Sequence, residues 1–594
     1  MKIVLVGINA KYIHTNLAVR SLQANAGKYR NEVEIAEYTI NHSIQEILSD
    51  LFDREPDVVG FSCYLWNIEY VMRLAQDWKK IWPQGKIVVG GPEVSYNPEK
   101  TFEQYPFVDL LIRGEGEYTF KEVLAWLHGE KQSRAELSGV AYLEEGELHI
   151  GPPQKAMDMD DLVFPYESLD GLENKILYYE SIRGCPFSCS YCLSSIERSV
   201  RIKSVEKTEK ELDFFIERKV PQVKFVDRTF NCNRDYAYEI WRYIGEHDNG
   251  VTNFHFEIGG DLLREKDFEL LKTFRPGLVQ FEIGVQSTNP DTIKAIRRTM
   301  DLKKLADCVA RVHEAGNIHE HLDLIAGLPF EDYDTFAKSF DEIYELRPNQ
   351  LQLGFLKVLK GSYMYEHAKE YEIEYHSRPP YEVLKTKWLP YEDVLKIRQV
   401  EEMLEVYYNS GQFEITMKVL GVLFKSAFFM FQELGKYYER NGYFGMSHAR
   451  IRRSEILLEF IKETFAGDIT AGEQRNITEA GKKADHLEIL DIIKESLIFD
   501  LYYRENCKSR PAWAKDLSVW KQVTRAYCKN GKQSHVECFS YRFPDKGERV
   551  LKELPKRAGK PLYALFDYTD RDPLDHQAKV TWIMEDEDAG LCSH

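Results

Sequence analysis

The chain has 594 residues, too many for a single hydrophobic core, so we expect roughly two to four domains. Its 43% apolar and 13% aromatic content is ordinary for a globular protein, and a net charge of −18 argues against a nucleic-acid partner for the chain as a whole. Three of the ten cysteines share one motif and the others are scattered, which suits a reducing cytoplasm better than a disulfide framework.

The first 135 residues alternate short apolar strands with helical segments. Strands are predicted at 2–7, 32–38, 58–62, 86–90 and 110–112, with helices such as 15–27 and 68–82 between them. This rhythm predicts an α/β domain over residues 1–135, with a doubly wound, Rossmann-like parallel sheet. No membrane segment is expected, because the apolar N-terminal run is too short for a signal peptide and the longest apolar stretch, 419–431, contains Lys425.

A hairpin and linker are predicted over residues 136–170, where strand-like runs at 139–142 and 147–150 flank a turn. Beyond Ile176 further strands are predicted at 222–226, 253–258, 278–284, 321–325 and 350–355. Six βα units predict a partial (βα)6 barrel over residues 171–380, short of the eight units of a full barrel. Residues 381–594 are predicted as a C-terminal domain, mainly helical and then mixed α+β, with an acidic tail at 585–588.

Three cysteines, Cys185, Cys189 and Cys192, form a C-x3-C-x2-C motif with an aromatic residue before the last cysteine. A cubane [4Fe–4S] cluster usually takes four protein thiolates, so three would leave one iron open to a small molecule. A zinc knuckle is the alternative, but it needs a fourth Cys or His, and no His lies within residues 178–203. Buried structural thiols are the other alternative.

This motif resembles the signature of radical S-adenosylmethionine (SAM) enzymes. The resemblance implies that the open iron binds SAM and that reductive cleavage of SAM releases a 5′-deoxyadenosyl radical. It also implies SAM contacts at the strand ends of the barrel, from Tyr191, Asp227, Phe230, Asn231, Glu257 and Gln286, with segment 323–331 near the adenine. For Arg297 and Arg298 we expect a solvated helix face.

Loops 62–67, 90–95 and 113–117 follow predicted strands and are rich in small residues, which let a backbone approach a large flat ligand. Together with segment 9–16 they resemble the cobalamin-binding domains that precede many radical SAM modules. The resemblance implies cobalamin contacts from Tyr12, Thr15, Asn16, Ser62, Leu65, Trp66, Asn67, Gly90, Gly91, Glu93, Gly114 and Glu115. The alternatives are a degenerate Rossmann-like domain that binds nothing and a flavodoxin-like module for another nucleotide.

The Asp-x-His-x-x-Gly motif that supplies a lower axial histidine in cobalamin domains is absent. His14 is the nearest histidine in sequence, but no Asp lies two residues before it. We therefore expect cobalamin to bind base-off without a histidine ligand, with Trp66 covering its lower face.

Both resemblances together imply a cobalamin-dependent radical SAM methyltransferase that methylates an unactivated carbon. A rearrangement or cyclisation of a peptide or small molecule is the enzymatic alternative, and a non-catalytic cobalamin carrier or sensor is the other. The chemistry also implies an external electron donor of the flavodoxin or ferredoxin type and a cytoplasmic location.

Residues 501–560 depart from the acidic balance of the chain, with fifteen Lys and Arg against six Asp and Glu. Aromatic residues are interleaved with these charges: Tyr502, Tyr503, Trp513, Trp520, Tyr527, Phe539 and Tyr541. That composition is typical of a surface that binds phosphates and stacks bases, so a tRNA-type or other polyanionic substrate is one interpretation. A solvated charged face on an ordinary domain is the other, and a peptide or small anionic substrate stays open.

Overall fold

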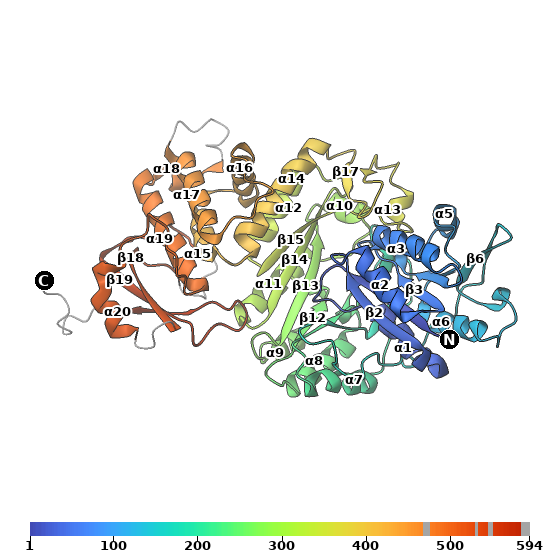
Figure 1. The fold of residues 1–594 in the computed structure, drawn as a ribbon. Coiled ribbons are helices and arrows are strands. Elements are labelled where there is room, and N and C mark those ends of the chain that lie inside the picture. Colours follow the sequence, from blue (N-terminus) through green and yellow to red (C-terminus); the bar gives the residue numbers. More distant parts are fainter. Residues whose placement is uncertain (467–475, 529–532, 545–549, 584–594) are drawn as a thin grey trace.

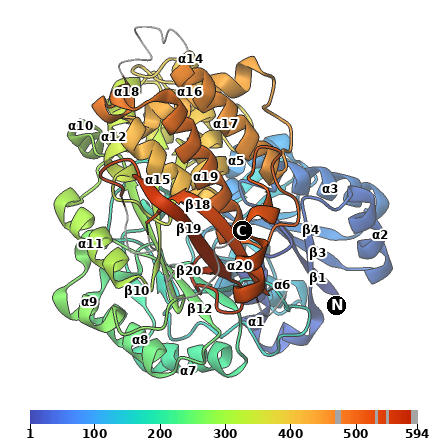
Figure 2. The same cartoon turned by 90° about the vertical axis from the view of Figure 1, so that its left-hand side faces the viewer.

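The computed structural model of this chain describes residues 1–466, 476–528, 533–544 and 550–583. Figure 1 shows an N-terminal sheet with helices (blue), a second, curved sheet (green) and a C-terminal body of helices with a small sheet (yellow to red). The curved sheet lies between the other two bodies, and Figure 2 views the molecule with the C-terminal body in front.

The N-terminal sheet has seven strands in the order β2-β1-β3-β4-β5-β6-β7, of which the first five in sequence are parallel. Its strands are β1 (Ile3–Asn9), β2 (Val33–Thr39), β3 (Val58–Ser62), β4 (Lys86–Gly90), β5 (Leu110–Ile112), β6 (Val140–Glu144) and β7 (Glu147–Ile150). The hairpin that we assigned to a linker instead extends this sheet, because β6 pairs antiparallel with β5.

Helices cover both faces of this sheet, because successive residues of a strand point to opposite faces. Ile3 and Leu5 of β1 pack with α1 (Leu17–Ala24) and α6 (Gly116–Leu127). Val4 and Val6 point the other way and pack with α2 (Ile44–Arg54), α3 (Ile68–Ile81) and α5 (Pro98–Gln104). The carboxyl ends of the parallel strands therefore meet at one edge, where open α/β sheets bind ligands.

The second sheet has six parallel strands in the order β15-β14-β13-β12-β11-β8. The strands are β8 (Leu177–Tyr179), β11 (Gln222–Phe225), β12 (Asn253–Glu257), β13 (Val279–Gln286), β14 (His319–Ala326) and β15 (Gln350–Phe355). Helices α7 (Val205–Glu217), α8 (Arg234–Glu246), α9 (Glu265–Leu271), α11 (Leu302–Ala315) and α12 (Tyr333–Tyr344) connect them. The outer strands β8 and β15 do not pair with each other, so this is the open (βα)6 barrel that the sequence predicts.

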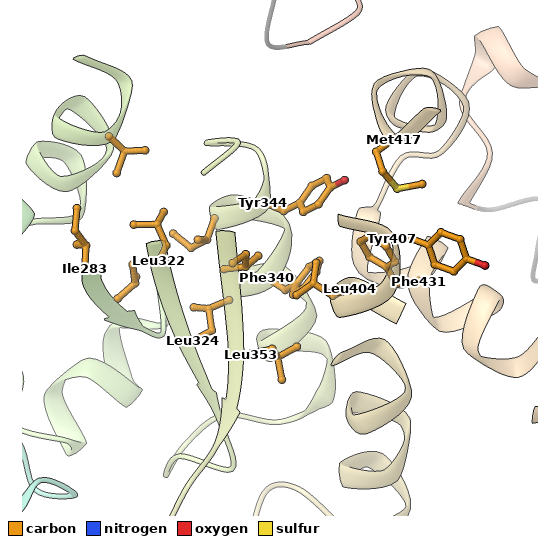
Figure 3. Packing of buried hydrophobic residues seen from close by; sticks show 14 of the residues in the cluster. Ile283, Leu322, Leu324, Phe340, Tyr344, Leu353, Leu404, Tyr407, Met417 and Phe431 are labelled. Atoms are coloured by element: carbon orange, nitrogen blue, oxygen red, sulfur yellow. The ribbon is translucent and has the colours of Figure 1, made fainter. Parts of the chain in front are cut away.

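The C-terminal body begins with α14 (Tyr391–Leu404), which runs into a π-helical turn (Glu405–Asn409). It continues with α15 (Glu414–Leu423), α16 (Ala427–Arg440), α17 (Arg450–Ala466), α18 (Glu479–Lys483), α19 (His486–Arg504), α20 (Lys521–Tyr527) and the antiparallel strands β18 (Ser534–Tyr541), β19 (Arg557–Asp567) and β20 (Lys579–Ile583). Figure 3 shows how the C-terminal body joins the barrel. Leu322, Leu324 and Leu353 of the barrel strands face α12. At the end of α12, Tyr344 packs against Phe431 of α16. One continuous hydrophobic core thus holds the C-terminal body against the barrel.

The apolar stretch 419–431 is divided between α15 and α16. Within the described ranges no helix is long and apolar enough to cross a membrane. The acidic tail at 585–588 lies outside the described residues.

Candidate cofactor sites

The cysteine motif lies on the loop between two short strands, β9 (Ile182–Arg183) and β10 (Arg201–Ile202), beyond the carboxyl end of β8. Cys185 and Cys189 are buried, Cys192 is half-buried, and all three are free thiols. Gly184 has a φ of +90°, and a Cβ atom there would collide with the carbonyl oxygen of Ser199. Glycine therefore lets the two arms of the loop approach each other, which gathers the cysteines.

No three His, Cys, Asp or Glu side chains of the described residues come together around a single metal ion. In a cubane cluster each thiolate binds a different iron, so a loop with three cysteines and no fourth Cys or His fits a cluster with one open iron better than a zinc ion. Burial raises the pKa of the Cys185 thiol, and metal binding would deprotonate it.

Arg298 corrects one expectation from the sequence. Its Nη1 lies 3.7 Å from Cys189 Sγ and 3.5 Å from the hydroxyl of Tyr191, and its Nη2 donates to the carbonyl oxygen of Gly284. The prediction of a solvated helix face was wrong for Arg298, because α10 (Pro290–Ala295) ends before it and the chain turns inward. Arg297 is exposed, and its guanidinium lies 3.6 Å from the ring centroid of Tyr363.

Three predicted SAM residues, Asp227, Phe230 and Asn231, hold loops in place. The buried Asp227 carboxylate accepts hydrogen bonds from the backbone N–H groups of Ser181 (2.8 Å) and Ile182 (2.9 Å) and from the Ser181 hydroxyl. Asn231 exchanges two 2.9 Å hydrogen bonds with the backbone of Gly259, and Phe230 lies in the aromatic core. All three donors belong to Ser181 and Ile182, so Asp227 positions the chain just before the cysteine loop.

Polar atoms without hydrogen-bond partners lie at the mouth of the barrel, where the carboxyl ends of its strands meet. Gln286 has a φ of 74° at a bulge in β13, and its Oε1 is shielded without a partner. Asp323 of β14 has a shielded oxygen that makes no hydrogen bond, although His321 Nε2 lies 3.2 Å from it, and burial raises the pKa of this carboxyl well above its ordinary value. Glu257 ends β12, 3.8 Å from Arg228. Strained residues and unsatisfied groups gathered at one end of a sheet are typical of a ligand site.

The barrel interior is polar, whereas most barrel interiors are packed with branched apolar residues. The Glu282 carboxylate accepts from Lys224 (2.9 Å) and lies 3.0 Å from His255 Nε2. Burial opposes ionisation of Glu282, but the hydrogen bond with His255 and the charge of Lys224 hold its pKa below the ordinary value. The alternation of apolar and polar residues along β14 could have predicted this polar lining. Leu322 and Leu324 face the helices, whereas His321 and Asp323 point to the opposite face of the sheet.

A cavity of about 620 Å³ opens between the N-terminal sheet and helices α1 and α6. Five predicted cobalamin residues line it: Ser62, Gly90, Gly91, Gly114 and Glu115. Gly60 and Gly90 of the sheet are part of its wall, and Gly91, directly after β4, has a φ of +112° at which a Cβ would collide with the carbonyl of Cys63. The cavity also reaches Glu180 and Arg183, directly before the cysteine loop. Its glycine-lined wall fits the nucleotide tail of cobalamin, because small residues let a large ligand approach the backbone closely.

A second cavity, of about 980 Å³, lies on the other side of the same loops, between α3 and residues 360–381. Leu65, Trp66 and Glu93 line it, and Tyr96 lines both cavities. The Trp66 ring is half-exposed and stacks on Tyr64 with centroids 4.5 Å apart. The two rings thus stand between the cavities, at the strand ends.

The other predicted cobalamin residues have structural partners. Asn16 caps α1 and donates to Ser62, Thr15 donates to the carbonyl of Ile176, and Asn67 is buried and braces its own loop. Tyr12 is 67% exposed and lines neither cavity. His14 Nδ1 lies 2.7 Å from the hydroxyl of Tyr178 in β8.

An ion-pair network joins the N-terminal domain to the cysteine loop. Arg183 reaches Glu115 (3.0 Å) and Glu117 (2.8 Å) from the first domain and Glu180 (2.7 Å) from its own strand region. Arg201 also pairs with Glu115. Burial opposes ionisation of Glu115, yet the hydrogen bond from Arg201 and both positive charges lower its pKa. Sequence reasoning missed both arginines, whose partners lie far away in the chain.

The aromatic surface predicted in the C-terminal domain is largely absent from the described residues. Tyr502, Trp520, Phe539 and Tyr541 are each at most 2% exposed and belong to the core, so their prediction as stacking residues was wrong. Two cations are neutralised as well, because Arg510 pairs with Glu537 and Lys515 with Glu495.

Comparisons with known proteins agree with this geometry. Residues 3–124 match the family described as B12 binding domain, residues 179–343 match the radical SAM superfamily, and residues 369–549 match a protein family of unknown function, DUF4080. The chain thus combines a B12-binding domain with a radical SAM domain, and cobalamin, SAM and a [4Fe–4S] cluster are the cofactors of that pair of domains.

The cobalamin-dependent radical SAM methyltransferase TokK of Streptomyces tokunonensis is 30% identical over 311 residues, which cover 49% of this chain and 45% of that protein. The 2-(S-pantetheinyl)-carbapenam-3-carboxylate methyltransferase of Streptantibioticus cattleyicolor is 29% identical, covering 51% and 46%. The match therefore spans less than half of either relative. The structure of OxsB, a cobalamin-dependent SAM radical enzyme with aqua-cobalamin and SAM bound, gives a TM-score of 0.57 at 17% identity, over 84% of this chain and 79% of that one.

Proposed function

We propose that this chain is a cobalamin-dependent radical SAM methyltransferase that methylates an unactivated carbon. The observation that carries the proposal is the meeting of two sites: the 620 Å³ cavity of the N-terminal domain ends at Glu180 and Arg183, next to the three cysteines. When bound, cobalamin supplies a transferable methyl group, and the cluster with SAM supplies a radical able to remove a hydrogen atom from carbon.

The residues of the chain have separate roles in this proposal. Cys185, Cys189 and Cys192 hold the cluster, one iron each. Ser62 and the glycines of the strand-end loops hold cobalamin. Gln286 and Asp323, with their unmatched atoms, face SAM or the substrate at the mouth of the barrel.

The test uses SAM with a labelled methyl group and the anaerobic, reduced enzyme in an extract that contains its substrate. A methyltransferase forms S-adenosylhomocysteine and 5′-deoxyadenosine and places the label on a third molecule. Production of 5′-deoxyadenosine alone, without S-adenosylhomocysteine, would support rearrangement or cyclisation instead. Release of neither product would support a carrier or sensor.

The electron for SAM cleavage comes from outside the chain in this proposal, from a flavodoxin- or ferredoxin-type donor.

For the substrate, we propose that a polyanion such as tRNA would contact exposed α20, where Lys521 and Arg525 are one helical turn apart. Lys529 and Lys532, which we also expected to contribute, lie outside the described residues. Charge reversal at Lys521 and Arg525 should weaken modification of such a substrate and flatten its salt dependence. Unchanged modification would favour a peptide or small molecule.

A further inference from the structure

A third cavity, of about 300 Å³, lies where the amino ends of β14 and β15 meet the C-terminal body, away from the cysteine loop. Its lining is mainly basic, aromatic and amide, and includes His319, Arg347, Tyr408, Arg504 and Gln577. Two acidic residues, Glu414 and Asp575, also line it. Segments distant in sequence form it: the starts of the two strands, the π-helical turn, α15, the end of α19, and residues 574–577. Nothing in the proposed methyl transfer uses this cavity.

The π-helical turn (Glu405–Asn409) fixes one wall of the cavity. The Asn409 side chain accepts from the backbone N–H of Leu351 (3.0 Å) and donates to its carbonyl (2.8 Å), so the turn is bonded to the edge strand β15. The Tyr408 hydroxyl donates to the carbonyl of Pro348 beside it. Single π-helical turns inside helices occur frequently at functional sites.

The two arginines in this cavity lack anionic partners among the described residues. Among the described residues, neither Arg347 nor Arg504 has a carboxylate within 4.0 Å, although both side chains are at least partly buried. Arg347 lies over the Tyr344 ring, and Arg504 donates to the backbone carbonyl of Asp575. Guanidinium groups withdrawn from water are normally paired with anions. By contrast, Lys418 in the same cavity is paired with Glu414 at 2.9 Å.

Three shielded atoms of the lining have no hydrogen-bond partner: Arg347 Nε, His319 Nδ1 and Gln577 Oε1. Gln577 is only 3% exposed, and its Nε2 already donates to Glu414, so the free oxygen is a fixed acceptor. A ligand that satisfies this lining therefore needs an anionic group for the arginines and a hydroxyl group for Gln577.

We propose that this cavity binds a small organic phosphate that also carries a hydroxyl group. Arginine forks match the geometry of phosphate oxygens, and a volume of about 300 Å³ is at the small end of ligand pockets. The site is independent of the proposed methyl transfer, so its failure would leave that function untouched.

The test is isothermal titration of the full-length, reconstituted enzyme with glycerol 3-phosphate, inorganic phosphate and malate at constant ionic strength. We expect saturable binding of glycerol 3-phosphate, weaker binding of inorganic phosphate, and weaker binding still of malate. Arg347→Met and Arg504→Met should each weaken glycerol 3-phosphate binding by roughly tenfold or more, because each removes charge-assisted hydrogen bonds. Gln577→Met should reduce the preference for glycerol 3-phosphate over inorganic phosphate.

The matched control is Arg234→Met, which removes an exposed arginine without an ion pair at the start of α8 and should leave binding unchanged. If Arg347→Met or Arg504→Met does not fold, Arg→Lys at the same position keeps the charge, loses the fork and should still weaken binding. Absence of saturable binding, or equal binding by the arginine variants and the wild type, would overturn the proposal. Tighter binding of malate than of glycerol 3-phosphate would overturn the assignment to a phosphate.

Discussion

Asp227 is a buried carboxylate that organises the backbone before the cysteine loop. Burial raises its pKa to about 7, and three donors from Ser181 and Ile182 point at its two oxygens. In Asp227→Ala the two backbone N–H groups and the Ser181 hydroxyl lose their common acceptor, which costs roughly 1–3 kcal/mol for a group left buried without a partner. We expect less iron and sulfide per chain after reconstitution. The control is Asp485→Ala, which removes the N-cap carboxylate of α19 at a cost of roughly 1 kcal/mol and lies outside the barrel. Equal cluster content in both variants would contradict the role given to Asp227.

At the cobalamin site we predict that no histidine binds the cobalt. Two residues bear on this prediction, His14 and Trp66. His14 already has a partner in Tyr178, and the Trp66 indole lies at the strand ends between the two cavities. Electron paramagnetic resonance of bound cob(II)alamin should therefore show no nitrogen superhyperfine splitting. A clear triplet pattern would mean that His14 or the cofactor's own base coordinates the cobalt from below.

At the scale of elements, α15 begins on a buried carboxylate. Asp500 of α19 accepts from the backbone N–H groups of Ile415 (2.8 Å) and Thr416 (2.9 Å) and from the Thr416 hydroxyl. Burial raises the pKa of Asp500 to about 7 from 3.8, so the folded state binds this proton more tightly than the unfolded state. Its contribution to the free energy of unfolding is complete below about pH 4 and falls as pH rises towards 7, by at most about 1.4 kcal/mol per pH unit.

Asp500→Asn should therefore lower stability at acidic pH and flatten its fall between pH 4 and 7. Denaturant unfolding at several pH values measures this. Burial also raises the pKa values of Asp227 and Glu331 to about 7. Stability of the variant should therefore still fall with pH in this window, but less steeply than in the wild type. A slope equal to that of the wild type would show that Asp500 does not titrate in this window.

The strands of both sheets were predictable because buried parallel strands are short apolar runs, and predicted strands 58–62, 86–90 and 350–355 agree with β3, β4 and β15. The hairpin 139–150 and the strand 110–112 were both recognised, but their pairing was not, because pairing between distant segments leaves no local signal. For the same reason Arg298 was placed in solvent, although it lies beside Cys189. Composition misled most in the C-terminal domain, where Trp520 and Tyr541 are buried and composition carries no information on burial.

At the scale of the whole molecule, Arg183 joins the two cofactor domains. Its side chain is 14% exposed and lies among three carboxylates. Arg183→Met would leave those charges without their central partner, which costs roughly 3–5 kcal/mol for a buried pair. We expect a lower melting temperature and faster loss of cobalamin on gel filtration.

The control is Arg242→Met, which breaks exposed pairs with Glu239 and Glu246 on α8 and should leave stability nearly unchanged, because solvent screens such pairs. If both variants retained cobalamin and stability equally, the network would not couple the domains.

The central claim is that the three cysteines of one loop hold the cluster that cleaves SAM. We would replace Cys185, Cys189 and Cys192 together with Ala, reconstitute the protein anaerobically, and quantify 5′-deoxyadenosine after reduction with dithionite. The matched control removes three half-buried thiols outside the motif, Cys507, Cys528 and Cys538. The wild type and the control should release 5′-deoxyadenosine, whereas the motif variant should release none and still bind cobalamin. Release of 5′-deoxyadenosine by the motif variant would contradict the assignment of the cluster to this loop.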